Sequence, residues 1–198
     1  MSTQWDAYDD GWSDTSTNGT YFPSKVVTIA GGLLDMTLHT EEGVHLVSAP
    51  VPKLPTMTYG RYAIRFRADA VPGYKTAWLL WPDSGVWPRD GEIDFPEGNL
   101  DGTIHGFMHR QDATTGGDQD AFSTEATYPT WHTAVIEWTA DRCELFLDGV
   151  SLGTATARIP NTPMHWVIQT ETQLGGGPPT DEAAGHVQID WVVAWSPE

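Results

Sequence analysis

The stretch TAVIEWTADRCELFLDGVSLGTA, residues 133–155, carries the clearest structural signal in the chain. Two apolar runs flank Asp148-Gly149, a dipeptide that favours the tight type I′ turn of a β-hairpin because both residues tolerate a positive φ. We therefore predict a hairpin here. Cys143, the one cysteine, lies in this stretch, so no internal disulfide is available and we expect it to be a small buried hydrophobe.

The patterns of three other segments also predict strands. Residues 61–70, RYAIRFRADA, alternate apolar and charged side chains with Ala63 as the exception, which is the period of a half-buried strand. Residues 26–40 hold two short apolar runs broken by Gly-Gly, and residues 187–195 form a last β-rich run. No window of a dozen residues carries a helical stripe. Many short strands with closely spaced turn signals predict an all-β sandwich or barrel.

Size and charge narrow the class of protein. The 198 residues suffice for one well-packed domain and are too few for two, so we expect a single domain over residues 1–198. The net charge of -17 disfavours nucleic acid, anionic membranes and highly sulfated substrates, because binding these takes clustered Lys and Arg. No apolar run approaches the length of a membrane span. We expect a monomer with neither nucleic-acid nor membrane partners.

Tryptophan is unusually frequent, with ten residues in the chain. One interpretation is core packing, because tryptophan is highly buried on average. The other is that some rings line a carbohydrate cleft, where a flat aromatic face stacks on a sugar ring and the indole N–H bonds a hydroxyl.

Three carboxylates lie within six positions: Glu92, Asp94 and Glu97. On a strand, Glu92 and Asp94 share a face, whereas Glu97 would lie on the opposite one. One extra residue in a β-bulge near Phe95-Pro96 restores the phase, and proline suits such a place because it has no N–H for the ladder. With that bulge, all three carboxylates face the same side.

Like charges on one face repel each other, and repulsion with partial burial raises at least one pKa, which makes a proton donor. Glycoside hydrolysis needs one ionised and one protonated carboxyl group close together. The alternatives are a solvated acidic edge and a calcium site. Apolar Ile93 and Phe95 favour a structured strand over a loop, and the nearby Trp78, Trp81 and Trp87 are not needed by a calcium loop.

Residues 91–97, GEIDFPE, resemble the Glu-x-Asp-x-x-Glu strand of glycoside hydrolase family 16, in its laminarinase-like branch. The resemblance covers most of residues 21–195 in the same order. The other similar segments are 59–62, 77–80, 87–88, 102–105, 131–138, 147–149 and 188–192.

The resemblance implies a jelly-roll β-sandwich of two antiparallel sheets with a concave substrate cleft. It implies that Glu92 is the nucleophile of a retaining reaction, that Glu97 is the acid and then the base, and that Asp94 hydrogen-bonds Glu92 between them. The reaction that the resemblance implies requires no cofactor. Some members bind a structural calcium ion near the chain ends, and Asp190 in the closing strand is the candidate ligand.

The candidate substrate contacts come from four segments. Gln169, Glu171 and Gln173 alternate, so they would be sugar contacts if their face is concave and a solvent-facing edge if it is not. By resemblance His105 is a better cleft residue than His109, which we expect to be solvated although it shares the same face. The expected substrate-binding residues are Trp78, Trp81, Trp87, His105, Gln169 and Glu171.

Together these features predict a retaining endo-β-glycosidase, with a neutral β-1,3-glucan as the first candidate substrate. A β-galactan such as agar or carrageenan, a transglycosylase and a non-catalytic carbohydrate-binding sandwich are the alternatives. The last is disfavoured because a binding module has no reason to keep three repelling carboxylates. A polymeric substrate suggests an extracellular location, although the start MSTQWDAYDDGW lacks the pattern of a signal peptide.

Overall fold

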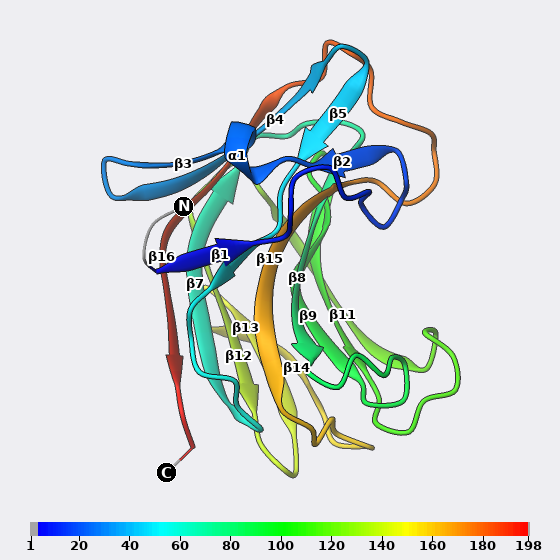
Figure 1. The fold of residues 1–198 in the computed structure, drawn as a ribbon. Coiled ribbons are helices and arrows are strands. Elements are labelled where there is room, and N and C mark those ends of the chain that lie inside the picture. The colour runs from blue at the N-terminus through cyan, green and yellow to red at the C-terminus, as the bar shows by residue number, and fades with distance from the viewer. Residues whose placement is uncertain (1–3, 198) are drawn as a thin grey trace.

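The computed structural model describes residues 4–197, which form two facing β-sheets and the short helix α1 (Pro23–Val26) (Figure 1). One sheet has five strands in the order β11 (Gln119–Thr127), β10 (Thr103–His109), β9 (Glu92–Asn99), β8 (Tyr74–Pro82) and β15 (Met164–Thr172). The other runs β14 (Val150–Ala155), β13 (Cys143–Leu147), β12 (His132–Trp138), β7 (Gly60–Ala68), β16 (Gly185–Trp195), β4 (Leu33–Glu41), β5 (Val44–Val47) and β2 (Gly19–Tyr21), and β3 (Val27–Ala30) adds to β4. The short strands β1 (Trp5–Ala7) and β6 (Pro50–Pro52) pair with each other.

The sheet order confirms the predicted jelly-roll sandwich. Strands distant in sequence are neighbours, as β8 is beside β15 and β7 is beside β16, and every pairing is antiparallel except β2 with β5. No helix among the described residues is long and apolar enough to cross a membrane.

The hairpin predicted from Asp148-Gly149 joins β13 to β14. Both residues have positive φ, 51° for Asp148 and 80° for Gly149, as a type I′ turn requires. The Asp148 carboxylate also accepts a hydrogen bond from the backbone N–H of Thr133 at 2.7 Å. Cys143, at the start of β13, is fully buried as expected.

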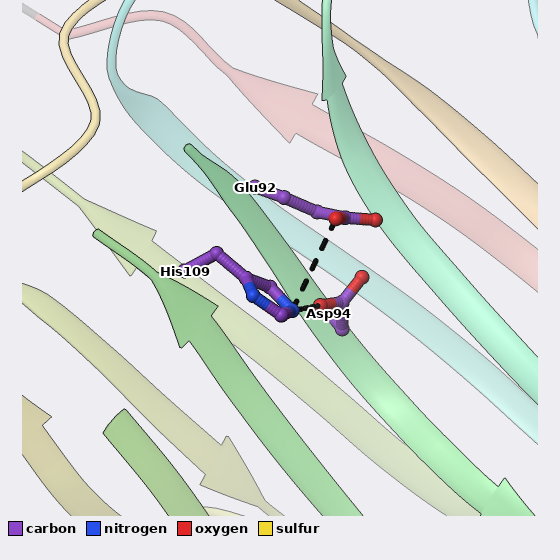
Figure 2. A group of neighbouring side chains, drawn as sticks. All are labelled: Glu92, Asp94 and His109. Carbon is purple, nitrogen blue, oxygen red and sulfur yellow. Dashed lines mark ion pairs between the residues drawn. The ribbon is translucent and has the colours of Figure 1, made fainter. Parts of the chain in front are cut away.

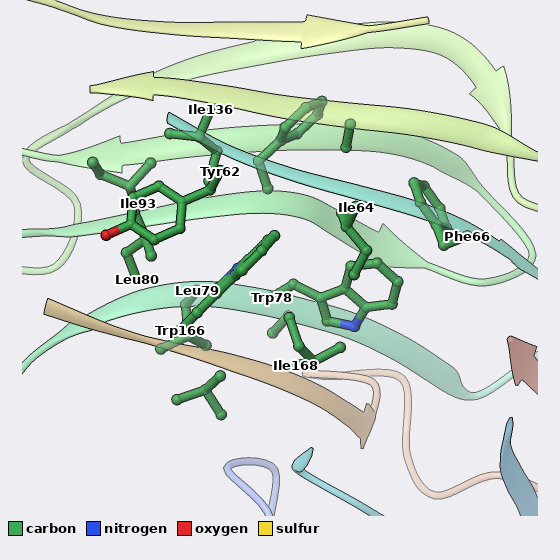
Figure 3. Close-up of a cluster of buried hydrophobic side chains, with 14 of the residues drawn as sticks. Tyr62, Ile64, Phe66, Trp78, Leu79, Leu80, Ile93, Ile136, Trp166 and Ile168 are labelled. Atoms are coloured by element: carbon green, nitrogen blue, oxygen red, sulfur yellow. The ribbon is translucent and has the colours of Figure 1, made fainter. Parts of the chain in front are cut away.

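Aromatic side chains fill the space between the sheets (Figure 3). Trp78 on β8 meets Phe66 on β7 edge-to-face, with ring centroids 4.9 Å apart. Trp166 on β15 meets Tyr62 on β7 in the same way at 5.5 Å. Such pairs add to the free energy gained by burying the rings. The core therefore fixes the five-stranded sheet from behind.

The alternation of side chains along β8 gives this sheet two different faces. Trp78 and Leu80 point into the core, whereas Ala77, Leu79 and Trp81 line a cleft on the opposite side. The concave face expected from the family resemblance is this outer face of the five-stranded sheet.

We expect replacement of Trp78 by alanine to lower the free energy of unfolding by about 3–5 kcal/mol, because it removes a large core ring and leaves a cavity. Trp191→Ala is the matched control, since this ring is 39% exposed, and it should change stability by no more than about 0.5 kcal/mol. Urea unfolding followed by fluorescence measures both. Similar losses in the two variants would contradict this placement of Trp78.

Candidate active site

A β-bulge in β9 puts the three carboxylates on one face. Across to β8, Glu97 lies opposite Ala77 and Asp94 lies opposite Leu79, so β9 advances three residues while β8 advances two. The pairing of β9 with β10 shifts at the same place. The extra residue falls at Phe95-Pro96, as predicted. Without it, the side chain of Glu97 would point into the core.

All three carboxylates line one cleft of about 560 Å³. The cleft crosses the five strands from β11 to β15 and ends against the segment that precedes β2. Its walls combine acidic and aromatic side chains. The lining residues are Tyr8, Trp12, Ser13, Asp14, Thr15, Tyr21, Lys75, Ala77, Leu79, Trp81, Trp87, Glu92, Asp94, Glu97, Phe107, His109, Gln119, Gln169, Glu171 and Leu174.

Glu92, Asp94 and His109 form a compact group in the cleft (Figure 2). His109 Nε2 lies 3.1 Å from Asp94 Oδ2 and 4.0 Å from Glu92 Oε2, close but not aligned as a hydrogen bond to Asp94. Its Nδ1 lies 2.8 Å from the carbonyl oxygen of Gly116, and a carbonyl only accepts, so Nδ1 carries a proton. The prediction that His109 is solvated was wrong, because its side chain is only 13% exposed.

Burial and mutual repulsion dominate the electrostatics of this group. Loss of solvation raises the pKa of Glu92 well above its usual value, and the neighbouring Asp94 charge raises it further, while His109 and Trp87 oppose the change. Loss of solvation also raises the pKa of Asp94, and the charge of Glu97 adds to this. The two buried carboxyl groups therefore tend to retain a proton at a pH where exposed acids have lost theirs.

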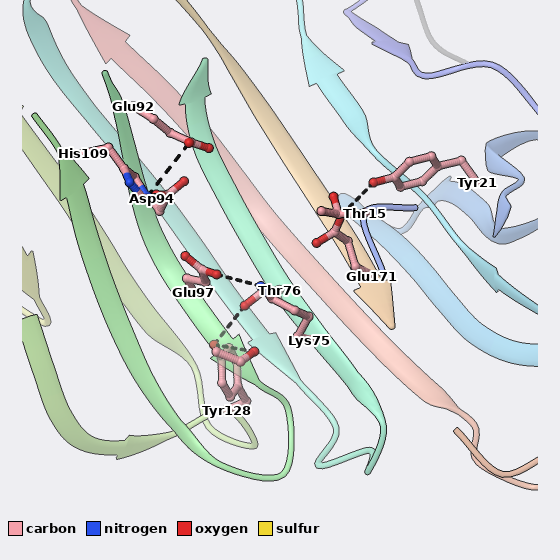
Figure 4. Close-up of polar contacts among 11 residues, drawn as sticks. Thr15, Tyr21, Lys75, Thr76, Glu92, Asp94, Glu97, His109, Tyr128 and Glu171 are labelled. Atoms are coloured by element: carbon pink, nitrogen blue, oxygen red, sulfur yellow. Dashed lines mark hydrogen bonds and ion pairs between the residues drawn. The ribbon is translucent and has the colours of Figure 1, made fainter. Parts of the chain in front are cut away.

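Glu97 has a different partner (Figure 4). The ammonium group of Lys75 donates a hydrogen bond to Glu97 Oε1 at 2.6 Å, and the two side chains are 7% and 19% exposed. Burial lowers the pKa of Lys75, but Glu97 outweighs this and raises it overall, so the lysine stays charged. This pairing disfavours the calcium alternative for the three carboxylates, because Lys75 already supplies a positive charge at Glu97.

Gln169 and Glu171 line the cleft from β15, which rejects the solvent-facing alternative for these two residues. Glu171 is 1% exposed and accepts hydrogen bonds from the Tyr21 hydroxyl at 2.9 Å and the Thr15 N–H at 3.2 Å. Burial raises the pKa of Tyr21, so this hydroxyl stays neutral and donates. Glu171 thereby fixes the segment before β2 against the sheet.

A second contact fastens the same segment. The Asp14 carboxylate accepts hydrogen bonds from the N–H of Thr172 at 2.8 Å and from its hydroxyl at 2.7 Å. Gly19 makes room for Asp14, because a Cβ there would lie 2.5 Å from Asp14 Oδ2. The segment brings Tyr8 and Trp12 to the cleft as its far wall.

The model of the family described as "Glycosyl hydrolases family 16" matches residues 13–193. The chain belongs to this family. The resemblance seen in the carboxylate strand is thus confirmed over nearly the whole chain, and this family consists of enzymes that hydrolyse glycosidic bonds.

Individual relatives of this family 16 chain support the same family assignment. The endo-1,3-1,4-beta-glycanase EglC of Rhizobium meliloti is 25% identical over 144 residues, which cover 70% of this chain and 30% of that protein. The chain thus spans less than a third of the length of that relative. A laminarinase from Rhodothermus marinus superposes with a TM-score of 0.81 at 25% identity, covering 98% of this chain and 90% of the other. The Bacillus licheniformis beta-glucanase has a TM-score of 0.81 at 18% identity, covering 100% and 94%, and so shares the fold.

The tryptophans expected to contact sugar fall into two groups. Trp81 and Trp87 line the cleft and stack at 6.5 Å with an interplanar angle of 17°, and Trp87 is 41% exposed. Trp78 is fully buried between the sheets, so its assignment as a substrate contact was wrong. On β8 it has the opposite phase to Trp81, and only alternate residues of a strand face the cleft.

His105 does not line the main cleft. It lies directly across from Glu97 in β10 and lines an adjoining hollow together with Lys75 and Asn99. Its ring nitrogens contact the Thr103 hydroxyl at 3.0 Å and the Ser123 hydroxyl at 3.3 Å. Of the two histidines on this face, His109 is the one beside Glu92 and Asp94.

Asp190, the candidate calcium ligand, has a cationic partner in the structure. Its carboxylate pairs with the guanidinium group of Arg65. Among residues 4–197, no group of three His, Cys, Asp or Glu side chains converges there.

Sequence reasoning missed Lys75 and His109 as site residues. Each had a signal in the strand period, since Lys75 is in phase with Trp81 and His109 is in phase with His105. Tyr8 and Trp12 left no comparable signal, because the segment that carries them is fastened to β15, which is more than 140 residues away.

We expect Glu92→Gln to stabilise the folded protein at pH 8 by about 1 kcal/mol or more relative to wild type. The raised pKa of Glu92 means that wild type loses stability as the pH rises above the ordinary glutamate value of 4.5, and the variant lacks this loss. The gain should therefore shrink toward zero at pH 4. Urea unfolding across this pH range measures the difference, and a gain independent of pH would contradict the pKa direction.

Proposed function

We propose that this family 16 chain is a retaining endo-β-glycosidase that hydrolyses a neutral β-linked glucan, with a β-1,3-glucan as the first candidate. One observation carries the proposal: the bulge in β9 turns Glu92 and Glu97 to the same cleft with Asp94 between them. The two carboxyl groups have unlike surroundings, as Glu92 is buried beside Asp94 while Glu97 meets Lys75. Different surroundings give two carboxyl groups different pKa values, and this difference lets one act as the nucleophile and the other as the acid.

The reaction would proceed in two displacements. In the first, a carboxylate oxygen of Glu92 attacks the anomeric carbon, the glycosidic C–O bond breaks, and Glu97 gives its proton to the leaving oxygen. In the second, Glu97 removes a proton from water, the water oxygen attacks the same carbon, and the ester bond to Glu92 breaks. Two inversions at one carbon leave its configuration unchanged.

Asp94 and His109 would hold Glu92 ready for attack. Because the pKa values of Glu92 and Asp94 are both raised, a proton retained by this pair can reside on Asp94 and leave Glu92 ionised. His109 presents Nε2 to both acids while Gly116 fixes its ring through Nδ1. In the free protein Asp94 would then donate a hydrogen bond that orients Glu92 before the proton passes to Glu97.

The shape of the cleft supports a polymeric substrate, and its charge supports a substrate without sulfate groups. The cleft crosses all five strands, so several sugar units of a long chain can lie over the carboxylates, as an endo-acting enzyme requires. Its acidic lining, which includes Asp14 and Glu171, would repel sulfate groups, and this disfavours carrageenan more than agar. The names of the Rhizobium and Rhodothermus relatives point to β-glucans.

The biological setting follows from the polymer. Polysaccharides lie outside the cell, so we place the protein there. We further propose that it acts as a monomer and needs no cofactor, because the chemistry above uses only its own side chains. A transglycosylase would use the same carboxylates, and only the identity of the acceptor differs.

We expect Glu92→Gln to reduce kcat at least about a thousandfold while the fold is retained, because an amide cannot form the ester intermediate. Circular dichroism checks the fold, and NMR of the first product should show the β-anomer in wild type. Near-normal turnover in the variant would refute Glu92 as the nucleophile, whereas an absence of turnover in wild type would favour a binding module. An initial α-anomer would refute retention.

We expect wild type to release reducing ends from laminarin or mixed-linkage glucan and not from carrageenan, because of the acidic cleft. A panel that also contains agarose decides between glucan and galactan. Activity on agarose alone would contradict the glucan assignment. Adding an acceptor oligosaccharide and analysing product lengths distinguishes hydrolysis from transglycosylation.

A further inference from the structure

Lys75 is the one lysine or arginine among the described residues that line the main cleft. It lies on β8 two residues before Ala77, on the face that lines the cleft, and Ala77 is the residue opposite Glu97. The Lys75 ammonium group therefore reaches Glu97 along the strand, at 2.6 Å. This contact depends on the bulge, which sets Glu97 on that face.

The groups that face Glu97 come from several elements, and Lys75 is the only permanent cation among them. The acids repel a charge on Glu97, whereas Lys75 attracts it at hydrogen-bond distance. Figure 4 shows Glu97 between the acid pair and Lys75. These groups are Lys75 on β8, Glu92 and Asp94 on β9, His105 on β10, Glu171 on β15 and the Tyr128 hydroxyl before β12.

Among the described residues, no lysine or arginine forms an ion pair with Glu92 or Asp94, and Lys75 lowers the pKa of Asp94 only as a smaller, more distant effect. The side chains of Glu92 and Asp94 are 10% and 4% exposed, and the nearest basic group is the imidazole of His109. A carboxylate is penalised by burial and stabilised by an adjacent ammonium group. A proton shared by the three acids is thus favoured on the Glu92–Asp94 pair and disfavoured on Glu97.

We propose that Lys75 is a positioning residue that keeps Glu97 ionised in the free protein, so that the proton for the leaving group is stored on the Glu92–Asp94 pair. This inference rests on the proposed function and deepens it. The reactive form needs this proton on Glu97, with Glu92 and Asp94 both ionised. The two forms carry the same total charge, and the reactive form is the less populated one. The Lys75 charge determines what fraction of the free protein is in the reactive form.

This order of protonation has a kinetic signature. If Glu97 loses its proton before the Glu92–Asp94 pair, the acid limb of the kcat/KM profile follows Glu97 and the alkaline limb follows the pair. Removing the positive charge of Lys75 then moves the acid limb upward. If Glu97 held the proton in the free protein, the same substitution would move the alkaline limb instead.

The first test needs no substrate. Carbon-13 NMR of protein labelled at the glutamate side-chain carboxyl follows each titration, with signals assigned by Glu97→Gln and Glu92→Gln. We expect Glu97 to titrate at lower pH than Glu92, and Lys75→Met to raise the Glu97 midpoint by about one pH unit, a tenfold change. Lys53→Met removes the same charge from a surface pair with Asp6 and should leave the midpoint in place.

The second test uses the pH profile of kcat/KM on a polysaccharide that wild type cleaves. We expect Lys75→Met to move the acid limb up by about one unit and the alkaline limb up by less, because Lys75 also lowers the pKa of Asp94, and Lys75→Arg to restore the wild-type profile. An alkaline limb that moves more than the acid limb, or an unmoved Glu97 midpoint in the NMR titration, overturns the proposal. Lys75→Gln replaces the methionine variant if that variant does not fold.

The two tests separate this inference from the proposed function. If wild type cleaves no polysaccharide, the function is refuted, while the NMR titration still decides the role of Lys75 at Glu97. If cleavage occurs and the Glu97 midpoint stays fixed when Lys75 is removed, only the inference is lost.

Discussion

The bulge at Phe95-Pro96 is the constraint on which the site depends. A regular β9 would place Glu97 behind the sheet, among the aromatic rings of the core, where no partner for its charge exists. With the bulge, Glu97 faces the cleft and reaches Lys75, while Phe95 still packs into the core. One inserted residue therefore brings the three carboxylates to one face without disturbing the hydrophobic face of the same strand.

The carboxylates on this face destabilise the fold because their charges are buried and repel each other. Different parts of the structure offset this cost. Glu97 is offset by Lys75, and Glu171 by the donors of Tyr21 and Thr15. Glu92 and Asp94 are buried with less compensation, and this burial together with the neighbouring carboxylates raises their pKa values. The aromatic core behind the sheet supplies the stability that allows this imbalance, since packed rings do not let the strands separate to relieve repulsion.

Local patterns predicted the features that depend on local geometry. The Asp148-Gly149 turn and the bulge near Pro96 follow from the conformational preferences of one or two residues, and both are present. The errors at Trp78 and His109 came from weighing residue type or resemblance above strand phase. The wall formed by Tyr8 and Trp12 was beyond reach, because it depends on hydrogen bonds across the sandwich that leave no periodic trace in the sequence.

That wall also separates two tasks within the cleft. The segment before β2 is held by Asp14 and Glu171 at the β15 edge, whereas the three clustered carboxylates lie on β9 and His109 lies on β10. A change in Trp12 could alter which sugar fits without altering the distances among Glu92, Asp94 and His109, because no strand pairing joins the segment to β9. Substrate preference can thus vary independently of the chemistry. This agrees with a family match that identifies the reaction more firmly than the polymer.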